Sequence, residues 1–206
     1  MKFADLSCDY RKFYKEIQER KQQFLNTKTD KKKVFKELCF CLLTPQSKAT
    51  SCWVAVEELF KAGYPDIDIN QIEAILRPKV RFYRNKAKYL VELAKKFNLI
   101  YKIINNKFEP KVLREILINE IKGLGMKEAS HFLRNIGYSF DLAILDRHIL
   151  ENLKRLKIIK NIPKSLTKRI YFEVEDKFLA FSKKIKISLV DLDLLFWAKQ
   201  TGFVFK

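Results

Sequence analysis

The strongest constraint on the fold of this chain is a pair of glycines, Gly123 and Gly125, within the segment Ile121–Lys127. Apolar residues recur at helical spacing on both sides, over about residues 110–136, so the pattern predicts a tight hairpin between two helices. Glycine adopts positive φ and permits close approach of a ligand, and the first turn of the second helix leaves backbone N–H groups unpaired. Such a hairpin can bind a phosphate without reading base sequence. An ordinary helix–helix turn is the alternative interpretation of the two glycines alone.

Helical periodicity also dominates the rest of the chain, which has only five glycines and five prolines. Caps and breakers predict helices at Asp30–Leu43, Gln46–Lys61, Asn70–Arg77 (opened by a capping box of Asn70 with Glu73), Tyr83–Phe97, Pro110–Ile121, Met126–Asn135, Asp146–Leu156, Ser165–Ile185 and Ser188–Gln200. Lys86 and Lys88 are placed on the polar face of the Tyr83–Phe97 helix. No convincing strand pair is present. We therefore predict an all-α protein of about ten helices that forms a single domain over residues 1–206.

The charge balance favours a polyanionic partner. The chain has 42 Lys and Arg against 24 Asp and Glu, a net charge of +18, which is typical of nucleic-acid binding. Charge alone does not separate DNA from RNA or from an anionic membrane, and a solvated basic surface is the plain alternative. No run approaches the roughly 20 apolar residues that span a bilayer, and the segment Met1–Asp5 lacks a signal-peptide core. We expect an intracellular protein, cytoplasmic or associated with the nucleoid, that does not bind membranes.

The cysteines give no sign of a metal centre. All four, Cys8, Cys39, Cys41 and Cys52, lie within the first 52 residues, and none has the spacing of a zinc site. We expect reduced thiols, no structural zinc and no iron–sulfur cluster.

Lys127 and Asp146 are the candidate reacting groups. A cation in the first turn of a helix opposes the helix dipole, and this field together with burial favours the neutral amine, which is a nucleophile. The Met126–Asn135 helix is about 15 Å long, and the ten residues after it reach up to roughly 33 Å, so the chain can return Asp146 to Lys127. Chance placement of one lysine among many, and a plain N-cap role for Asp146, are the alternatives.

Together these residues resemble the helix–hairpin–helix superfamily of base-excision DNA glycosylases. Gly123, Gly125, Lys127 and Asp146 match its hairpin, its catalytic lysine and its aspartate, and His148 matches the Asp-x-His arrangement of 8-oxoguanine glycosylases. The segments 42–46 and 80–88 resemble two further family segments. The chain departs from the superfamily pattern where Leu145 replaces the usual proline and where the four-cysteine cluster of the endonuclease III branch is absent.

The short length, the segment Leu145–His148 and the C-terminal Lys206 look like the compact 8-oxoguanine DNA glycosylase/lyase family, which lacks an N-terminal β-domain. The resemblance implies two helical lobes with an active-site cleft between them. It also implies a double-stranded DNA substrate that contains 8-oxoguanine. Lys127 would attack C1′ and form a Schiff base, and β-elimination would follow. The only implied ion is a monovalent cation at the hairpin carbonyls, and no redox cofactor or catalytic divalent metal is expected.

The remaining candidates concern DNA contacts. The resemblance implies that the Gly123 and Gly125 amides hold a backbone phosphate, and we expect His148 to contact another. Trp197 and Phe82 are candidates to stack on an extruded base, with core packing as the alternative, and Lys206 is implied in base recognition. Gln46 is a candidate to fill the gap in the duplex or to contact the orphan base, with a solvated position at a helix start as the alternative. Action on another lesion and a non-catalytic DNA-binding module are the competing functions. We expect a monomer.

Overall fold

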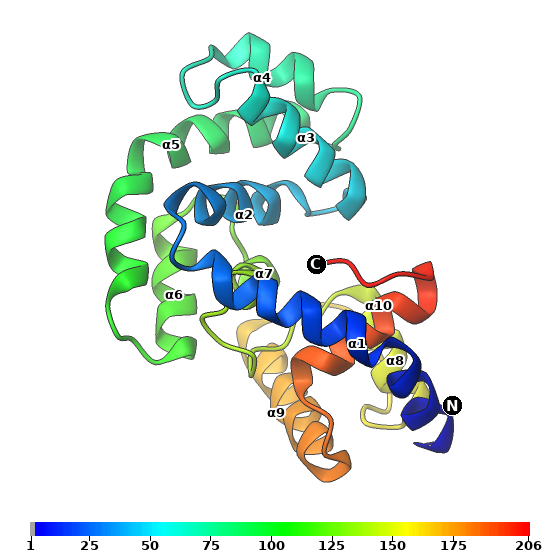
Figure 1. Cartoon of the computed structure of the whole chain (residues 1–206). Helices are drawn as coiled ribbons and strands as arrows, with labels where there is room; N and C mark the ends of the chain where they lie inside the picture. Colours follow the sequence, from blue (N-terminus) through cyan, green and yellow to red (C-terminus); the bar gives the residue numbers. More distant parts are fainter. Residues whose placement is uncertain (1–2) are drawn as a thin grey trace. The chain divides into compact units, whose positions relative to one another are not determined.

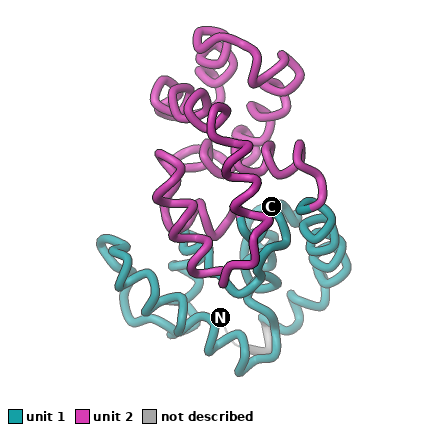
Figure 2. The backbone as a smooth tube through the Cα atoms, turned by 90° about the vertical axis from the view of Figure 1, so that its left-hand side faces the viewer, with its two compact units in different colours: residues 1–28, 133–206 teal, residues 29–132 magenta. Residues whose placement is uncertain are grey.

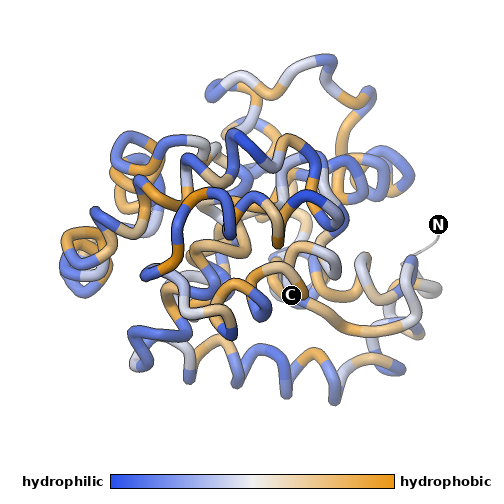
Figure 3. Tube along the Cα trace, turned by 90° about the horizontal axis from the view of Figure 1, so that it is seen from above, coloured by the Kyte–Doolittle hydropathy of each residue, from blue (hydrophilic) through white to orange (hydrophobic). Residues whose placement is uncertain are grey.

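The computed structural model describes residues 3–206, with side chains from Leu6 onward, and over this range it contains ten α-helices and no strand (Figure 1). The prediction of an all-α protein is therefore confirmed. The chain divides into two compact units, residues 29–132 and residues 1–28 with 133–206 (Figure 2). Hydrophilic and hydrophobic residues alternate along most helices in Figure 3, as expected where one face of each helix is buried.

The unit of residues 29–132 is built around α2. It contains α2 (Lys31–Leu43), α3 (Ala49–Lys61), α4 (Ile69–Leu76), α5 (Tyr83–Asn105), α6 (Pro110–Glu120) and residues 126–132 of α7 (Met126–Asn135). Nine of the thirteen residues of α2 are buried, which makes this helix the core of the unit. Helices α3 and α5 pack on α2, and α4 packs on both α3 and α5.

The second unit is built around α10. It contains α1 (Phe3–Thr27), α8 (Arg147–Arg155), α9 (Lys168–Ile185) and α10 (Leu189–Thr201), and α10 packs on the other three. The Asp191 carboxylate at the start of α10 is buried, and it accepts a hydrogen bond from the Tyr10 hydroxyl at 2.5 Å and an ion pair from Lys21 at 2.8 Å. These contacts fasten the N-terminal helix to the last helix of the chain.

Several predicted helix limits agree with the structure because the sequence carries their caps. The Asp30 carboxylate accepts from the Lys33 N–H, and Asp146 caps α8 in the same way. Pro110 lies in the first turn of α6, where a missing N–H costs nothing. Helix α7 has the predicted bounds, and Gly202 ends α10.

Other predicted limits were wrong. Helix α3 begins at Ala49 and not at Gln46, because Gln46 has φ 54°. The capping box of α4 is formed by Asp68 with Gln71 rather than by Asn70 with Glu73. Helix α5 continues past Phe97 to Asn105, α9 begins at Lys168 after a Thr167 cap rather than at Ser165, and helix α1 was not predicted.

None of the helices within residues 3–206 has both the length and the apolar character needed to cross a membrane.

Candidate active site

The hairpin between α6 and α7 is a turn that only glycine fits at its first position. Gly123 has φ +86°, and a Cβ atom there would lie 2.4 Å from Cδ2 of Tyr89. The Leu124 N–H donates to the carbonyl of Ile121 at 3.2 Å and closes the turn. The ring of Tyr89 on α5 therefore packs against the hairpin at Gly123, a role that sequence reasoning missed because Tyr89 is far from the glycines in the chain.

A buried hydrogen-bond chain joins the two helices of the hairpin. Arg114 on α6 is fully buried, and its Nη1 donates to the Ser130 hydroxyl on α7 at 3.0 Å. That hydroxyl donates to the carbonyl of Met126 at 2.9 Å. The bonds fix the start of α7, whose first-turn amides carry the partial positive charge that favours an anion.

Lys127 lies in this first turn of α7, with its side chain 23% exposed. Its Nζ is 3.1 Å from Oε1 of Glu128. The Glu128 carboxylate also lies over the hairpin, since a Cβ on Gly125 would be 2.9 Å from Oε2. Glu128 was not singled out in the sequence, although an acidic residue in a first turn is a recognisable signal.

Gln46 and Phe82 lie in loops rather than in helices. Gln46 is exposed between α2 and α3, and Phe82 is the residue before α5, with its side chain 54% exposed. The guanidinium of Arg81 lies 5.7 Å from the centre of the Phe82 ring. Core packing is therefore excluded for Phe82, and its exposed ring is free to stack on a base.

The prediction that Lys86 lies on the polar, solvent-facing side of its helix was wrong. Lys86 is only 4% exposed. Its Nζ donates hydrogen bonds to the carbonyls of Leu43 and Pro45 and to the Ser47 hydroxyl. Burial lowers its pKa to about 8, and the positive charge of Lys127 acts in the same direction. The charge of Lys127 therefore acts on Lys86.

Asp146 belongs to the other unit, where it caps α8 by accepting from the Ile149 N–H at 2.8 Å. The segment before it is held by α9. The Tyr171 hydroxyl donates to the carbonyl of Ala143 at 2.6 Å and accepts from the Leu145 N–H at 3.3 Å. Leu145 therefore uses a backbone donor that proline, usual at this position in the superfamily, does not have.

His148 is the second residue of α8 and lines a cavity of about 510 Å³ within the same unit. The other lining residues are Glu151, Asn152, Arg155, Phe196, Lys199 and Gln200. The Nδ1 atom of His148 is buried and makes no hydrogen bond within the described structure. The cavity is lined by charges of both signs, Glu151, Arg155 and Lys199, and Lys199 forms an ion pair with Asp9.

Trp197 and Lys206 lie at the C-terminal end of the chain, on and after α10. The Trp197 ring is partly buried, and its centre lies 5.9 Å from that of Phe205. The Thr201 hydroxyl is within hydrogen-bond distance of the carbonyls of Trp197 and Phe203, at 2.9 and 3.1 Å. These contacts fold the last residues back along α10 and hold Lys206 in a partly exposed position.

The predicted residues thus divide between the units. The unit of residues 29–132 holds Gln46, Phe82, Gly123, Gly125 and Lys127, and the unit with both chain ends holds Asp146, His148, Trp197 and Lys206. Within residues 3–206, no group of three or more His, Cys, Asp or Glu side chains could hold a metal ion, and all four cysteines are free thiols.

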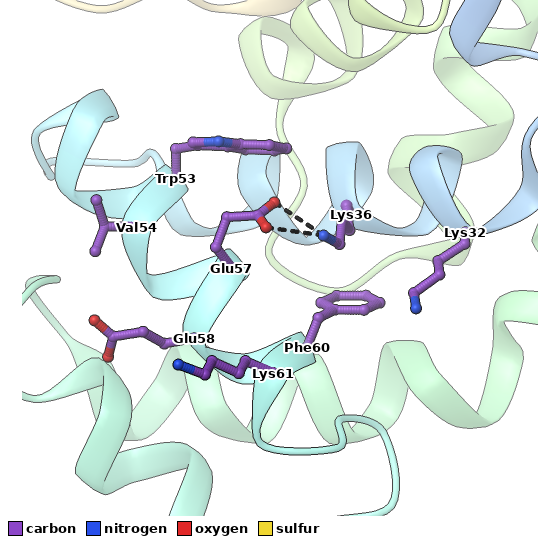
Figure 4. A pocket seen from close by; sticks show the side chains of 8 residues that line it. All are labelled: Lys32, Lys36, Trp53, Val54, Glu57, Glu58, Phe60 and Lys61. Atoms are coloured by element: carbon purple, nitrogen blue, oxygen red, sulfur yellow. Dashed lines mark hydrogen bonds and ion pairs between the residues drawn. The ribbon is translucent and has the colours of Figure 1, made fainter.

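A separate groove between α2 and α3, of about 540 Å³, contains none of the predicted site residues (Figure 4). Its central charges are paired. Lys36 lies 2.9 Å from Glu57, as drawn in Figure 4, and Glu58 lies 2.7 Å from Lys79. The groove therefore offers no obvious reacting group.

Comparisons with known proteins agree on one family. The sequence profile described as 8-oxoguanine DNA glycosylase matches residues 17–187. The chain is 41% identical over 214 aligned residues to the 8-oxoguanine DNA glycosylase/AP lyase of Fusobacterium nucleatum, with 99% of this chain and 97% of that protein covered.

Two solved structures are similar along nearly the whole chain. The Methanocaldococcus jannaschii 8-oxoguanine glycosylase/lyase in complex with 15mer DNA containing 8-oxoguanine has a TM-score of 0.88 at 36% identity, covering 96% of this chain and 98% of that one. The 8-oxoguanine DNA glycosylase of Thermotoga maritima has a TM-score of 0.89 at 31% identity, covering 98% and 97%.

Proposed function

This chain belongs to the 8-oxoguanine DNA glycosylase family, and we propose that it excises 8-oxoguanine from DNA through a Schiff base on Lys127 and then cleaves the strand. The observation that carries the proposal is the position of Lys127. Its amine lies in the first turn of α7, directly after the glycine hairpin that favours a phosphate. A nucleophile is thereby placed beside the DNA backbone.

The proposed reaction begins with extrusion of the damaged nucleotide from the duplex, because its C1′ atom is not accessible inside the stack. The hairpin amides around Gly123 and Gly125 hold a backbone phosphate. Lys127 attacks C1′ as the neutral amine, and the bond from C1′ to N9 of 8-oxoguanine breaks, with the electron pair leaving on the base. Opening of the sugar gives the Schiff base, and β-elimination then breaks the C3′–O bond on the 3′ side.

We assign Asp146 to charge stabilisation. Its carboxylate accepts a backbone N–H as the cap of α8, and this bond fixes the orientation of the carboxylate. An ionised carboxylate stabilises the positive charge that develops on the sugar as the base leaves. His148, the second residue of α8, is assigned to a further phosphate.

Base recognition is assigned to four residues. Phe82 and Trp197 stack on the extruded base, Lys206 contacts it through its side chain, and Gln46 fills the gap left in the duplex. 8-Oxoguanine differs from guanine by an N–H at position 7. An acceptor that only this N–H satisfies would give the selectivity, because an unpaired buried polar group is costly.

The family resemblance also implies a monovalent cation at the hairpin. The backbone carbonyl oxygens of the turn from Ile121 to Gly125 are ligands suited to such an ion, so these residues fit it. Its chemistry would be to hold the turn and reinforce the positive potential toward a phosphate. We also propose that the protein acts as a monomer and works in the compartment that contains the DNA.

Substitution of Lys127 by glutamine tests the mechanism. Lys127→Gln should give no covalent DNA adduct with borohydride on an 8-oxoguanine duplex, while it still binds that duplex, because only the amine is removed. Lys88→Gln, an exposed lysine on α5, is the matched control and should be trapped normally. Persistent trapping in Lys127→Gln would show that another amine is the nucleophile.

The same assay on a panel of single-lesion duplexes tests the substrate. Preferential release of an oxidised pyrimidine would assign the chain to another lesion. Binding without trapping on any lesion would leave only a DNA-binding module.

A further inference from the structure

Lys86 is a buried cation whose hydrogen bonds reach a loop at the edge of the candidate site. Its ammonium donates to the carbonyl of Leu43 at 2.7 Å, to the carbonyl of Pro45 at 2.8 Å and to Oγ of Ser47 at 2.8 Å. All three protons of the ammonium are therefore used. A charge is buried at great cost unless it is hydrogen-bonded, so these acceptors are what permit a lysine here.

The Ser47 hydroxyl connects this cluster to a second loop. Its Oγ accepts the backbone N–H of Arg81 at 2.9 Å as well as the ammonium of Lys86. The loop between α2 and α3 and the loop before α5 are thus tied at a single oxygen atom. We call Lys86, Ser47 and the Arg81 N–H the Lys86 junction.

Each of the two tied loops carries a non-glycine residue with positive φ. Gln46 has φ 54° and Phe82 has φ 56°. This region is sparsely populated by residues other than glycine, and such strain persists only where the surrounding structure fixes it. Gln46 lies between two residues that bond to Lys86, and Phe82 directly follows Arg81. Both side chains are exposed, so their own burial does not hold these conformations.

The junction lies close to the candidate nucleophile within the same unit. Burial is the largest influence on Lys86 and lowers its pKa to about 8, with the charges of Lys127 and Arg81 acting in the same direction. The Glu128 carboxylate opposes this shift. The side chains around Lys86 therefore include the ion pair of Lys127 with Glu128.

We propose that Lys86 is a positioning residue for lesion recognition. It fixes the backbone conformations of Gln46 and Phe82 relative to each other, so that both side chains contact the DNA in a defined geometry. The inference rests on the proposed function, in which these two residues contact the extruded base and the gap it leaves. Lys86 itself does not touch the DNA. The role differs from that of Lys127, because it acts before the bond to the base breaks.

A purely structural role for Lys86 gives a different expectation. Leu43 ends α2, and a lysine that bonds to its carbonyl also stabilises that helix end. Loss of this bond alone would lower stability and reduce every activity in parallel. A positioning role predicts a split, because an abasic site has no base for Phe82 to stack on. Release of 8-oxoguanine should fall, and cleavage at a preformed abasic site should persist.

The experiment compares Lys86→Met, Ser47→Ala and the exposed control Lys88→Met under single-turnover conditions. We expect release of 8-oxoguanine to fall on the order of tenfold in the first two variants, as for loss of a hydrogen bond to a charged group. Cleavage of abasic DNA should stay within about twofold of the wild-type rate, which places the loss before the lyase step. Lys88→Met should change neither rate. A parallel fall in both reactions would overturn the inference.

Ser47→Ala keeps the inference testable if Lys86→Met does not fold, since it removes one acceptor and leaves the two carbonyls. It should be combined with Phe82→Ala. If the junction acts by placing Phe82, the double variant should be little worse than Phe82→Ala alone, whereas fully additive losses would overturn the inference. If the wild-type chain releases no 8-oxoguanine, the proposed function itself fails before any variant is compared.

Discussion

Among single residues, Lys86 has a protonation behaviour that bears directly on stability. Burial lowers its pKa from 10.5 to about 8, whereas in the unfolded chain it keeps the ordinary value. Below pH 8 both states are protonated, and the cost of burying the ammonium is fully present. Between pH 8 and 10.5 the unfolded chain holds a proton that the folded chain has lost, so the contribution of Lys86 to the free energy of unfolding rises with pH.

This linkage gives a prediction for Lys86→Met. The free energy of unfolding of the wild type, relative to this variant, should increase above pH 8 by on the order of 1 kcal/mol for each pH unit. Urea denaturation at several pH values between 7 and 10 measures the difference, and Lys88→Met should show no such trend. A difference that stays constant between pH 8 and pH 10 would mean that the three hydrogen bonds offset burial, so that the pKa of Lys86 is not lowered.

Some residues of the candidate site can be predicted from the sequence, and others cannot. The two glycines and Lys127 are visible because glycine at a turn and a cation at a helix start are unusual choices. Lys86 is hidden, because one buried lysine looks like any other among 42 basic residues. The positive φ values of Gln46 and Phe82 are equally hidden, since neither residue type signals a left-handed backbone.

Among the elements, α9 has a specific task, which is to hold the segment that leads to Asp146. Its Tyr171 is 1% exposed and bridges two backbone groups, and its Glu175 accepts the Ala143 N–H at 2.8 Å. This segment is neither helix nor strand, so its backbone groups need partners from elsewhere. The helix thereby fixes the backbone position from which Asp146 starts α8.

Tyr171→Phe removes the bridging hydroxyl and leaves a buried N–H and a buried carbonyl without that partner. Such unpaired groups cost about 1–3 kcal/mol each, so we expect a lower melting temperature and slower release of 8-oxoguanine. The rate loss should be smaller than in Asp146→Asn, which removes the charge itself. Single-turnover rates and thermal melts check this, with Tyr14→Phe on exposed Tyr14 as the control. An unchanged rate in a destabilised Tyr171→Phe protein would show that α9 supports stability and not the position of Asp146.

Element limits follow from the sequence where a local signal fixes them. Helix α7 was predicted with its observed bounds because glycines flank it on both sides, and Asp146 was predicted as a cap. Helix α1 was missed, although it has 25 residues. Its buried positions are few, with Leu6, Ile17 and Phe24 among them, so its apolar stripe is too sparse to stand out from the many polar residues around it.

On the scale of the whole molecule, the pairing of distant segments is what sequence reasoning could not provide. One unit takes residues from both ends of the chain. The hydrogen bond that fastens Tyr10 to Asp191 joins residues 181 positions apart. Local periodicity predicts a helix and its apolar face, but it carries no information about which other face will cover it.

The net charge of +18 is a property of the whole chain. We expect it to determine the affinity of the protein for undamaged DNA and the dependence of that affinity on salt. Binding that neutralises several phosphates releases counterions, so the logarithm of the association constant should fall linearly with the logarithm of the salt concentration. For about five phosphates the slope would be roughly −4.5. Fluorescence anisotropy measures this slope at salt concentrations from about 50 to about 200 mM, where the affinity of such proteins for DNA falls steeply. Lys127→Gln is the suitable form for the measurement, because it cannot become trapped on the DNA. The rate of base release at saturating protein should change far less with salt, since the bond-breaking step follows binding. An association constant that does not change with salt concentration would mean that the excess positive charge does not contact the DNA backbone.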